Sequence, residues 1–487
     1  MPELRSFAKR IGLLGLSNLL VTVSNILILP VLTKKLPIDD YGIWIQLIIT
    51  STLLSNFLTL ALPNSIPRFL APKKEKNEIQ EDFYSLLFFV LAINIVSAFI
   101  LFVMASTVAA IFFAGNIFVA KMLLPITFFT SLNSLFLVFF LARQNVKKYT
   151  LMLLTQTYLN VILVVLVLTN GYGINGAITA YLVSQITVCL LMGSLITRQI
   201  GIKLPHFLNL KQYLNFSLPL IPSVLAFWAV NSCDRYVINF FLGVSWVGYY
   251  SPGYTLGNLI ILFAYPFASL LPASLATYYD ENRVDAVQVL LKYSTKYFLV
   301  LAVPAATVLC VLSKPILATV TTSNIATYAW FITPFTAISA VLYGLYTITS
   351  QVITLEKKTR LIGMIWACAA ILNIGVNIVL VPYIGILGAA ASTLLSYTFV
   401  FIMATYYASK LFRFDFEFDN LIKTICAAAF VAFIITAINP IGVIGILAYC
   451  LLGLLVYFGL MVILGAIPRN ELNFFMELIG RDKTGRR

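Results

Sequence analysis

The sequence predicts an all-α integral membrane protein with about fourteen transmembrane helices. Of its 487 residues, 61% are hydrophobic and only 10% are charged, whereas soluble globular chains are about 45–50% apolar and about 25% charged. The apolar runs are roughly 20 residues long and do not alternate in polarity, which favours spanning helices over a barrel. Lysines and arginines gather on one side of the alternating segments, as the positive-inside rule requires.

Windows of roughly 20 apolar residues place each helix in turn. The run that opens the chain follows Arg5, Lys9 and Arg10, but it is too long for a signal peptide and lacks a cleavage site of small residues, so we expect a permanent helix. The expected helices lie at 12–33, 41–64, 83–104, 118–142, 149–169, 173–197, 213–233, 245–271, 293–312, 325–350, 360–381, 384–408, 421–438 and 441–466.

The basic residues test this helix count. If the N-terminus is cytoplasmic and the helices alternate, the inner segments hold 27 of the 32 lysines and arginines. One wrongly split or merged helix would invert every later loop and remove this asymmetry. We therefore expect both termini in the cytoplasm and the net charge of +14 to face the anionic inner leaflet. Because these charges are spread over eight short segments, nucleic-acid binding is not expected.

Three sequence pairs at nearly one spacing indicate an internal duplication. An offset of about six helices preserves orientation, so the halves are parallel repeats about an axis along the membrane normal. We expect two pseudo-symmetric six-helix lobes in a V, 1–205 and 206–410, followed by helices 13 and 14 and a basic cytoplasmic tail in 411–487. The pairs are 41–44 (YGIW) with 247–250 (VGYY), 145–148 (NVKK) with 355–358 (LEKK), and 173–177 (GINGA) with 385–389 (GILGA).

Several motifs resemble those of polysaccharide flippases. The segment 32–44 (LTKKLPIDDYGIW) resembles the turn after their first helix, 216–223 (FSLPLIPS) with 234–236 (DRY) resembles their seventh helix, and 247–251 (VGYYS) resembles the start of their eighth. The chain is thus similar to O-antigen repeat-unit flippases of the multidrug/oligosaccharidyl-lipid/polysaccharide exporter superfamily.

This resemblance implies an activity, a location and partners. It implies alternating-access transfer of a polyprenyl-diphosphate-linked oligosaccharide repeat unit from the cytoplasmic to the outer leaflet of the plasma (inner) membrane. Such transfer serves the biosynthesis of lipopolysaccharide and other cell-surface polysaccharides. The implied partners are the lipid-linked oligosaccharide, membrane lipids and polysaccharide polymerase or assembly proteins.

Uncharged polar and aromatic residues on shared helical faces are the candidates for a substrate cavity. Amide and phenol groups suit a sugar chain, whose hydroxyls need donors and acceptors and whose apolar faces stack on rings. The same groups also serve to hold helices together or to anchor the membrane interface. The cavity candidates are Asn18, Asn25, Asn231, Tyr250, Tyr254, Asn258 and Tyr265.

Charged residues at helix ends are the candidates for attracting the diphosphate. They are Arg235 on the outer side and, on the inner side, Arg68, Lys292 and Lys296. Asp234 is the only acidic residue at the end of an apolar run and is the candidate for ion coupling, although a local ion pair with Arg235 is the simpler interpretation. No carboxylate is expected at mid-helix, and this disfavours cation-coupled antiporters, which typically use one.

The sequence predicts no enzyme chemistry, no metal site and no cofactor. The six cysteines are scattered singly without a CxxC pair, and His206 is the only histidine, so neither a metal centre nor a His-based triad is expected. A cation-coupled drug or small-molecule antiporter of the same superfamily is the alternative. A membrane polysaccharide polymerase or ligase is the second alternative, disfavoured because the longest outer stretch is only about a dozen residues.

Overall fold

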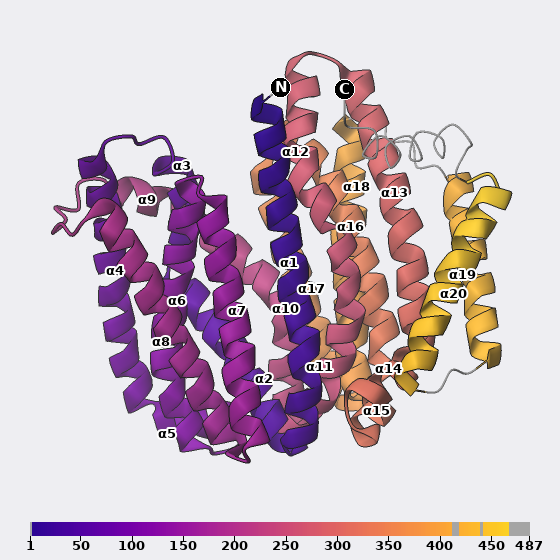
Figure 1. The fold of residues 1–487 in the computed structure, drawn as a ribbon, viewed down its shortest axis with the longest axis horizontal. Helices are drawn as coiled ribbons and strands as arrows, with labels where there is room; N and C mark the ends of the chain where they lie inside the picture. The colour runs from indigo at the N-terminus through magenta and orange to yellow at the C-terminus, as the bar shows by residue number, and fades with distance from the viewer. Residues whose placement is uncertain (1, 412–417, 439–441, 467–487) are drawn as a thin grey trace, which may run out of the picture. The chain divides into compact units, whose positions relative to one another are not determined.

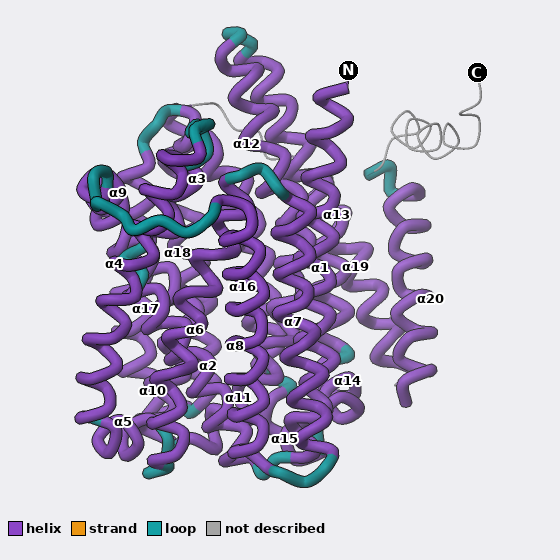
Figure 2. Tube along the Cα trace, turned by 60° about the vertical axis from the view of Figure 1, so that its left-hand side comes forward, coloured by secondary structure: helices purple, strands orange, loops and turns teal. Residues whose placement is uncertain are grey.

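The computed structural model describes residues 2–411, 418–438 and 442–466, and in these ranges helices are the only regular elements (Figures 1 and 2). In chain order they are α1 (Pro2–Lys35), α2 (Ile38–Leu58), η1 (Leu62–Asn64), α3 (Ile66–Phe69), α4 (Lys76–Val103), α5 (Ala105–Phe112), α6 (Ile117–Ala142), α7 (Val146–Thr169), α8 (Gly173–Ile200), α9 (Leu210–Ser217), η2 (Leu218–Leu220), α10 (Ile221–Leu242), α11 (Val244–Asn258), η3 (Leu259–Phe263), α12 (Tyr265–Asp280), α13 (Val284–Val311), α14 (Ser313–Val320), α15 (Ser323–Ala329), α16 (Ile332–Leu355), α17 (Thr359–Ile384), α18 (Ile386–Leu411), α19 (Phe418–Ile438) and α20 (Gly442–Ile463).

The predicted all-α membrane fold is confirmed. Thirteen helical segments in the described ranges are long and apolar enough to cross a membrane. Each coincides with one predicted helix, and α20 coincides with the fourteenth. The chain is therefore a multi-pass helical membrane protein. The part of the basic tail beyond residue 466 lies outside the described residues.

Two predicted helices are interrupted by short 3₁₀ segments. The helix expected at 213–233 is broken by η2, where Pro219 lacks a backbone donor, and α10 then continues to Leu242. The helix expected at 245–271 is broken by η3. These breaks change which side chains share a face, because a 3₁₀ turn has about three residues instead of 3.6.

Packing divides the chain into two compact units, and the first contains most of the helices. Unit 1 comprises Met1–Pro252, Val320–Tyr328 and Thr359–Val400. Within it, α7 packs on α1 and α8, α6 packs on α2, α4 and α8, and α10 packs on α17 and α2. Helices α4, α6, α7 and α8 run side by side in both views (Figures 1 and 2).

Unit 2 comprises Gly253–Thr319, Ala329–Lys358 and Phe401–Arg487. Its central helix is α13, which packs on α12, α16 and α19, while α19 also packs on α20. These units group helices by packing, and unit 1 contains α10 and α17 together with the first six predicted helices. The division into lobes at 205/206 and 410/411 stays a prediction.

Helices α2 and α11 meet at their N-terminal ends in a contact that follows the internal repeat. A Cβ on Gly42 would lie 2.1 Å from the Val244 carbonyl oxygen, and a Cβ on Gly248 would lie 2.8 Å from the Ile38 carbonyl oxygen. The offset that relates Gly42 to Gly248 also relates Ile38 to Val244, so each helix presents the same two positions to the other. Glycine permits this approach because it has no side chain to fill the gap.

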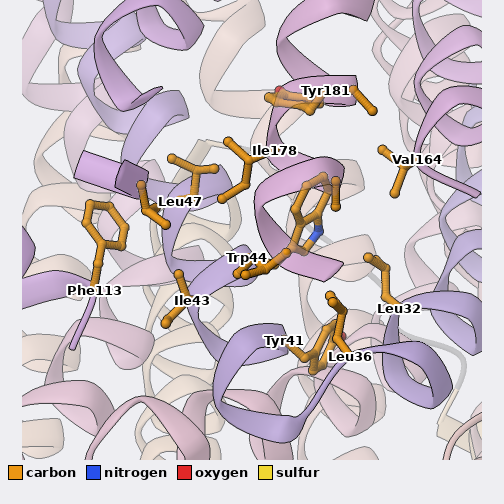
Figure 3. Close-up of a cluster of buried hydrophobic side chains, with 14 of the residues drawn as sticks. Leu32, Leu36, Tyr41, Ile43, Trp44, Leu47, Phe113, Val164, Ile178 and Tyr181 are labelled. Carbon is orange, nitrogen blue, oxygen red and sulfur yellow. The ribbon is translucent and has the colours of Figure 1, made fainter. Parts of the chain in front are cut away.

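A buried apolar core surrounds this contact. The ring of Trp44 on α2 meets Tyr181 on α8 edge to face, with centroids 5.8 Å apart. At the exposed margin, the Ser245 hydroxyl donates to the carboxylate of Asp39, which lies 206 positions earlier in the chain. Residues of this core labelled in Figure 3 are Leu32, Leu36, Tyr41, Ile43, Trp44, Leu47, Phe113, Val164, Ile178 and Tyr181.

Candidate substrate site

An ion pair between neighbouring residues lies inside α10. Arg235 Nη1 is 2.8 Å from Asp234 Oδ1, and both side chains are buried. The Tyr250 hydroxyl donates to the other carboxylate oxygen of Asp234, and the guanidinium lies 5.2 Å from the centre of the Tyr250 ring. Arg235 also donates to the Asn231 carbonyl at 2.7 Å. The carboxylate and the guanidinium therefore compensate each other away from water, as buried charges require.

The position of this pair corrects the sequence analysis. The pair was expected at the outer end of its helix, but α10 continues to Leu242, so Asp234 and Arg235 lie within the spanning segment. The predicted position of Asp234 at the end of its helix is therefore wrong, because a carboxylate lies inside this spanning segment. The apolar run appeared to end at Cys233 because each charge was counted alone, whereas the pair is nearly neutral as a unit.

The ion pair continues into a hydrogen-bonded network between α10, α17 and α18. The Tyr397 hydroxyl donates to Asn231 Oδ1 at 2.7 Å. The Cys233 thiol donates to Asn373 Oδ1 at 3.0 Å. Asn377 Nδ2 donates to the Asn373 carbonyl at 2.9 Å and to the Ser392 hydroxyl at 2.9 Å. Polar groups from three spanning helices thus bond to one another inside unit 1.

Sequence reasoning missed most of this network. Asn373 and Asn377 are four positions apart, as are Ser392 and Ser396, so each pair lies on one face of its helix. That spacing was a usable signal, because polar pairs at helical spacing in apolar segments mark buried or functional faces. The structure joins the two faces through the bond from Asn373 Nδ2 to the Ser396 hydroxyl at 3.1 Å.

Of the four residues expected on one face of the eighth helix, Tyr250, Tyr254 and Asn258 lie on α11, and η3 separates Tyr265 from them. Tyr250 belongs to unit 1 and is fully buried, whereas Tyr254 and Asn258 belong to unit 2. Tyr265 begins α12 after the 3₁₀ segment and is 37% exposed. The predicted face therefore does not extend to Tyr265, since η3 shifts the register between Asn258 and Tyr265.

The polar residues of α1 separate into buried serines and accessible asparagines. Ser17 and Ser24 are buried and donate to carbonyls of their own helix, at 2.8 and 2.7 Å. Asn18 is half-buried and Asn25 is exposed. The two amides are therefore more exposed than the serines of this helix.

Arg68 lies on α3, in a segment that the sequence analysis predicts to be cytoplasmic. Its guanidinium lies 4.7 Å from the ring centre of Phe216 and 5.7 Å from that of Phe69. It lines an open cavity of about 480 Å³ together with Lys73 and Lys74, among other residues. Stacking on two rings holds the guanidinium in place and leaves its donors available to an anion.

Lys292 and Lys296 were expected at the end of a helix, but both lie within α13. This helix begins at Val284, before the predicted start at 293. Lys296 is only 7% exposed, and its ammonium lies 5.8 Å from the ring centres of both Tyr293 and Tyr297. The aliphatic stem and the flanking rings allow a cation at this depth, while Lys292 is half-buried.

Two carboxylates near the start of α4 were also misplaced by the sequence analysis. Glu81 and Asp82 were expected in an inner loop, but α4 begins at Lys76 and both side chains are buried. The Lys73 ammonium lies 2.6 Å from Asp82 Oδ2, and the Tyr213 hydroxyl donates to that oxygen at 2.6 Å. The local charge of 76–82 hid the helix from a hydropathy window.

The fold resembles those of solved membrane transporters. The structure of lipid II flippase MurJ in an inward closed conformation matches 92% of this chain and 98% of its own, with 16% identity and a TM-score of 0.77. An inward-facing multidrug resistance MATE family transporter of the MOP superfamily matches 80% of this chain and 94% of its own, with 15% identity and a TM-score of 0.65. The chain therefore has the helical fold of this class of membrane transporter.

Sequence comparisons define the family within this class. Residues 7–277 match the family model described as polysaccharide biosynthesis protein, so the chain belongs to this family. Residues 219–379 match the MatE model. The chain is also 23% identical over 221 residues to the probable low-salt glycan biosynthesis flippase Agl15 of Haloferax volcanii. That match covers 45% of this chain and 47% of the relative, about half the length of each.

Proposed function

We propose that this protein is a flippase that moves a polyprenyl-diphosphate-linked oligosaccharide repeat unit from the cytoplasmic to the outer leaflet. The observation that carries the proposal is a fold similar to that of a lipid II flippase over 92% of the chain, in a member of the polysaccharide biosynthesis protein family. The chain would act in cell-surface polysaccharide synthesis, such as that of lipopolysaccharide O-antigen, in the plasma (inner) membrane with both termini in the cytoplasm. Polymerase or assembly proteins would take up its product.

In this proposal, the glycine contact between α2 and α11 is the part of the protein that opens and closes. On the proposed topology both helices begin at the outer face, so the contact closes that face within unit 1. Gly42 and Gly248 allow the two backbones to touch. Opening it would release the substrate outward, as alternating access requires.

Polar and basic groups would hold the two parts of the substrate. Asn18 and Asn25 offer amides to sugar hydroxyls, and aromatic rings would stack on the apolar faces of the sugars. Arg68 and Lys296 carry cations braced by aromatic rings, which suits a diphosphate. Arg235 is already engaged with Asp234, so it would reach an anion only by exchange. The proposed activity forms and breaks no covalent bond and uses no cofactor.

A cation-coupled antiporter is the second candidate, favoured by one observation. Asp234 is a carboxylate inside a spanning helix, and it lies in the region that matches the MatE model. Intramembrane carboxylates are costly and commonly serve ion coupling. Against this candidate, Arg235 and Tyr250 already occupy both oxygens of Asp234, which leaves little room for a coupling cation.

Transport by the purified protein in liposomes distinguishes the two candidates. A fluorescent polyprenyl-diphosphate oligosaccharide should reach the opposite leaflet only when the protein is present. In the variant Asp39→Cys/Ser245→Cys, oxidation should stop this transfer by locking α2 to α11, and reduction should restore it. The single variant Asp39→Cys under the same oxidant is the control. If the lipid-linked sugar never moves while an imposed ion gradient drives efflux of a cationic dye, the antiporter is the correct function.

A further inference from the structure

The connection between α8 and α9 is unusually apolar for a loop at a membrane surface. Residues 201–209 (GIKLPHFLN) expose Ile202, Leu204 and Leu208 by 81%, 75% and 73%. These side chains pack on nothing that would remove them from water. Large apolar side chains exposed together mark a surface that binds a partner or a membrane.

Buried side chains of α4 hold this loop in place. Glu81 Oε1 accepts hydrogen bonds from the backbone amides of His206 at 2.8 Å and Leu208 at 3.3 Å. Asp82 Oδ1 accepts from Asn209 Nδ2 at 2.8 Å. The Tyr84 hydroxyl donates to the carbonyl of residue 201 at 2.5 Å. The loop is therefore a fixed part of unit 1, presented in one orientation, with its apolar side chains directed away from these anchors.

The anchors also fix the depth of the loop in the membrane. Helix α4 has 28 residues and is thus about 42 Å long, whereas the hydrocarbon core is about 30 Å thick and needs about 20 residues. The uncharged part of α4 begins at Phe83, directly after the buried carboxylates. Bonds from residues 81–84 therefore place the loop at the boundary between hydrocarbon and headgroups, and not out in the cytoplasm.

Basic residues surround the apolar side chains. Arg198 on α8 and Lys211 on α9 are exposed at the two ends of the loop, and Lys203 lies within it. The Lys76 ammonium lies beside Gly201. Apolar side chains flanked by lysine and arginine are the arrangement with which interfacial segments bind anionic leaflets.

We propose that residues 202–208 form an interfacial anchor that inserts into the anionic lipid leaflet beside α4. The apolar side chains enter the boundary between headgroups and acyl chains, and the flanking cations contact lipid phosphates. The buried carboxylates Glu81 and Asp82 act as positioning residues that hold the loop at this depth. The anchor joins the two predicted repeats, so it would keep their connection on the membrane surface during transport. This inference does not depend on which substrate is transported.

Fluorescence of a probe in nanodiscs tests this placement without any transport assay. The full-length protein, with its native cysteines replaced, receives a single cysteine as Leu204→Cys and is labelled with the environment-sensitive dye NBD. The matched control is Glu281→Cys in the polar connection between α12 and α13, where the side chain is exposed. In nanodiscs of phosphatidylglycerol and phosphatidylethanolamine, NBD at residue 204 should emit at shorter wavelength than at 281. Lipids spin-labelled near the headgroup should quench NBD at residue 204 several-fold more than NBD at residue 281.

Two further measurements make the outcome decisive. Pure phosphatidylcholine nanodiscs should reduce the quenching at 204, because the lysines and arginines lose their anionic partners. The labelled variant Leu204→Cys/Glu81→Gln should also be quenched less, while its unfolding temperature reports that the protein remains folded. If NBD at 204 behaves like NBD at 281 in every lipid, the loop faces water and the proposal is wrong. Protection that appears only when another protein is added would overturn it in favour of a protein-docking loop.

Discussion

Replacing Gly42 by alanine is the most direct test of the α2–α11 contact. The added Cβ would lie 2.1 Å from the Val244 carbonyl oxygen and 2.9 Å from its carbonyl carbon. Both obstructing atoms belong to backbone, so no side-chain rotation relieves the clash. The two helices must separate by roughly 1.3 Å or more to restore ordinary contact. We expect Gly42→Ala to favour the state in which the outer face is open.

The size of this effect follows from the cost of overpacking. Inserting a methyl group into a well-packed contact typically costs about 1–3 kcal/mol. If the closed state bears this cost and the open state does not, the ratio of open to closed molecules rises roughly 5- to 150-fold. Gly248→Ala should act in the same direction but less strongly, because its nearest obstacles, an Ile38 carbonyl oxygen and side-chain carbon, lie at 2.8 Å.

Disulfide formation between Asp39→Cys and Ser245→Cys measures the closed state. These side chains are hydrogen-bonded partners across the contact, so in membranes they should cross-link readily under mild oxidation. Adding Gly42→Ala should lower the rate of cross-linking in proportion to the fall in the closed population, by at most the factor given above. The control is Gly375→Ala in α17, where a Cβ meets no atom within 4 Å and the rate should stay unchanged. Unaltered cross-linking in the Gly42→Ala background would refute the steric reasoning.

Three other substitutions test the buried charges. Asp82→Ala should lower thermal stability in detergent by about 3 kcal/mol, since the carboxylate has an ion pair and a tyrosine donor. The control Glu78→Ala, on the exposed side of the same helix, should have little effect. Equal losses of stability in the two variants would contradict this role of Asp82. Arg235→Leu alone should cost about 3–5 kcal/mol by stranding a buried carboxylate, but the double variant with Asp234→Ile should regain most of that stability, as measured by the yield of folded monomer. Lys296→Ala should reduce transfer of the lipid-linked sugar without lowering membrane insertion, and normal transfer would exclude this lysine from the diphosphate path.

The number of helices was predictable because length and apolarity decide whether a segment spans a bilayer. Their ends were not, and Asp234 shows why. A hydropathy window treats each charge as isolated, so the predicted helix stopped at residue 233. A carboxylate bonded to the next residue's guanidinium costs much less to bury than either charge alone. That compensation depends on side-chain geometry, which composition does not contain.

The same reason explains the late predicted start of α4. Lys76, Glu78, Glu81 and Asp82 make its first turns polar, so a window placed the helix at 83. In the structure Glu81 Oε1 and Asp82 Oδ1 accept hydrogen bonds from the chain that follows α8, more than 100 positions away. Long-range partners of this kind cannot be read from local sequence. The polar spacing in α17 and α18, in contrast, could have been read from local sequence, since Asn373 and Asn377 share a helical face.

Comparing equivalent positions of the predicted repeat shows which helix pair carries the buried polar residues. Helices α1 and α7 pack as a pair in the first half, and α10 and α17 pack as the corresponding pair in the second. The offset that relates Gly42 to Gly248 maps Asp234 and Arg235 onto Ile28 and Leu29, which lie in the apolar core of unit 1. The helix pair α1–α7 is thus stabilised by apolar packing, and the helix pair α10–α17 by hydrogen bonds and charge. Because water and anions compete for hydrogen bonds but not for apolar contacts, the second pair is where a charged ligand would act on the fold.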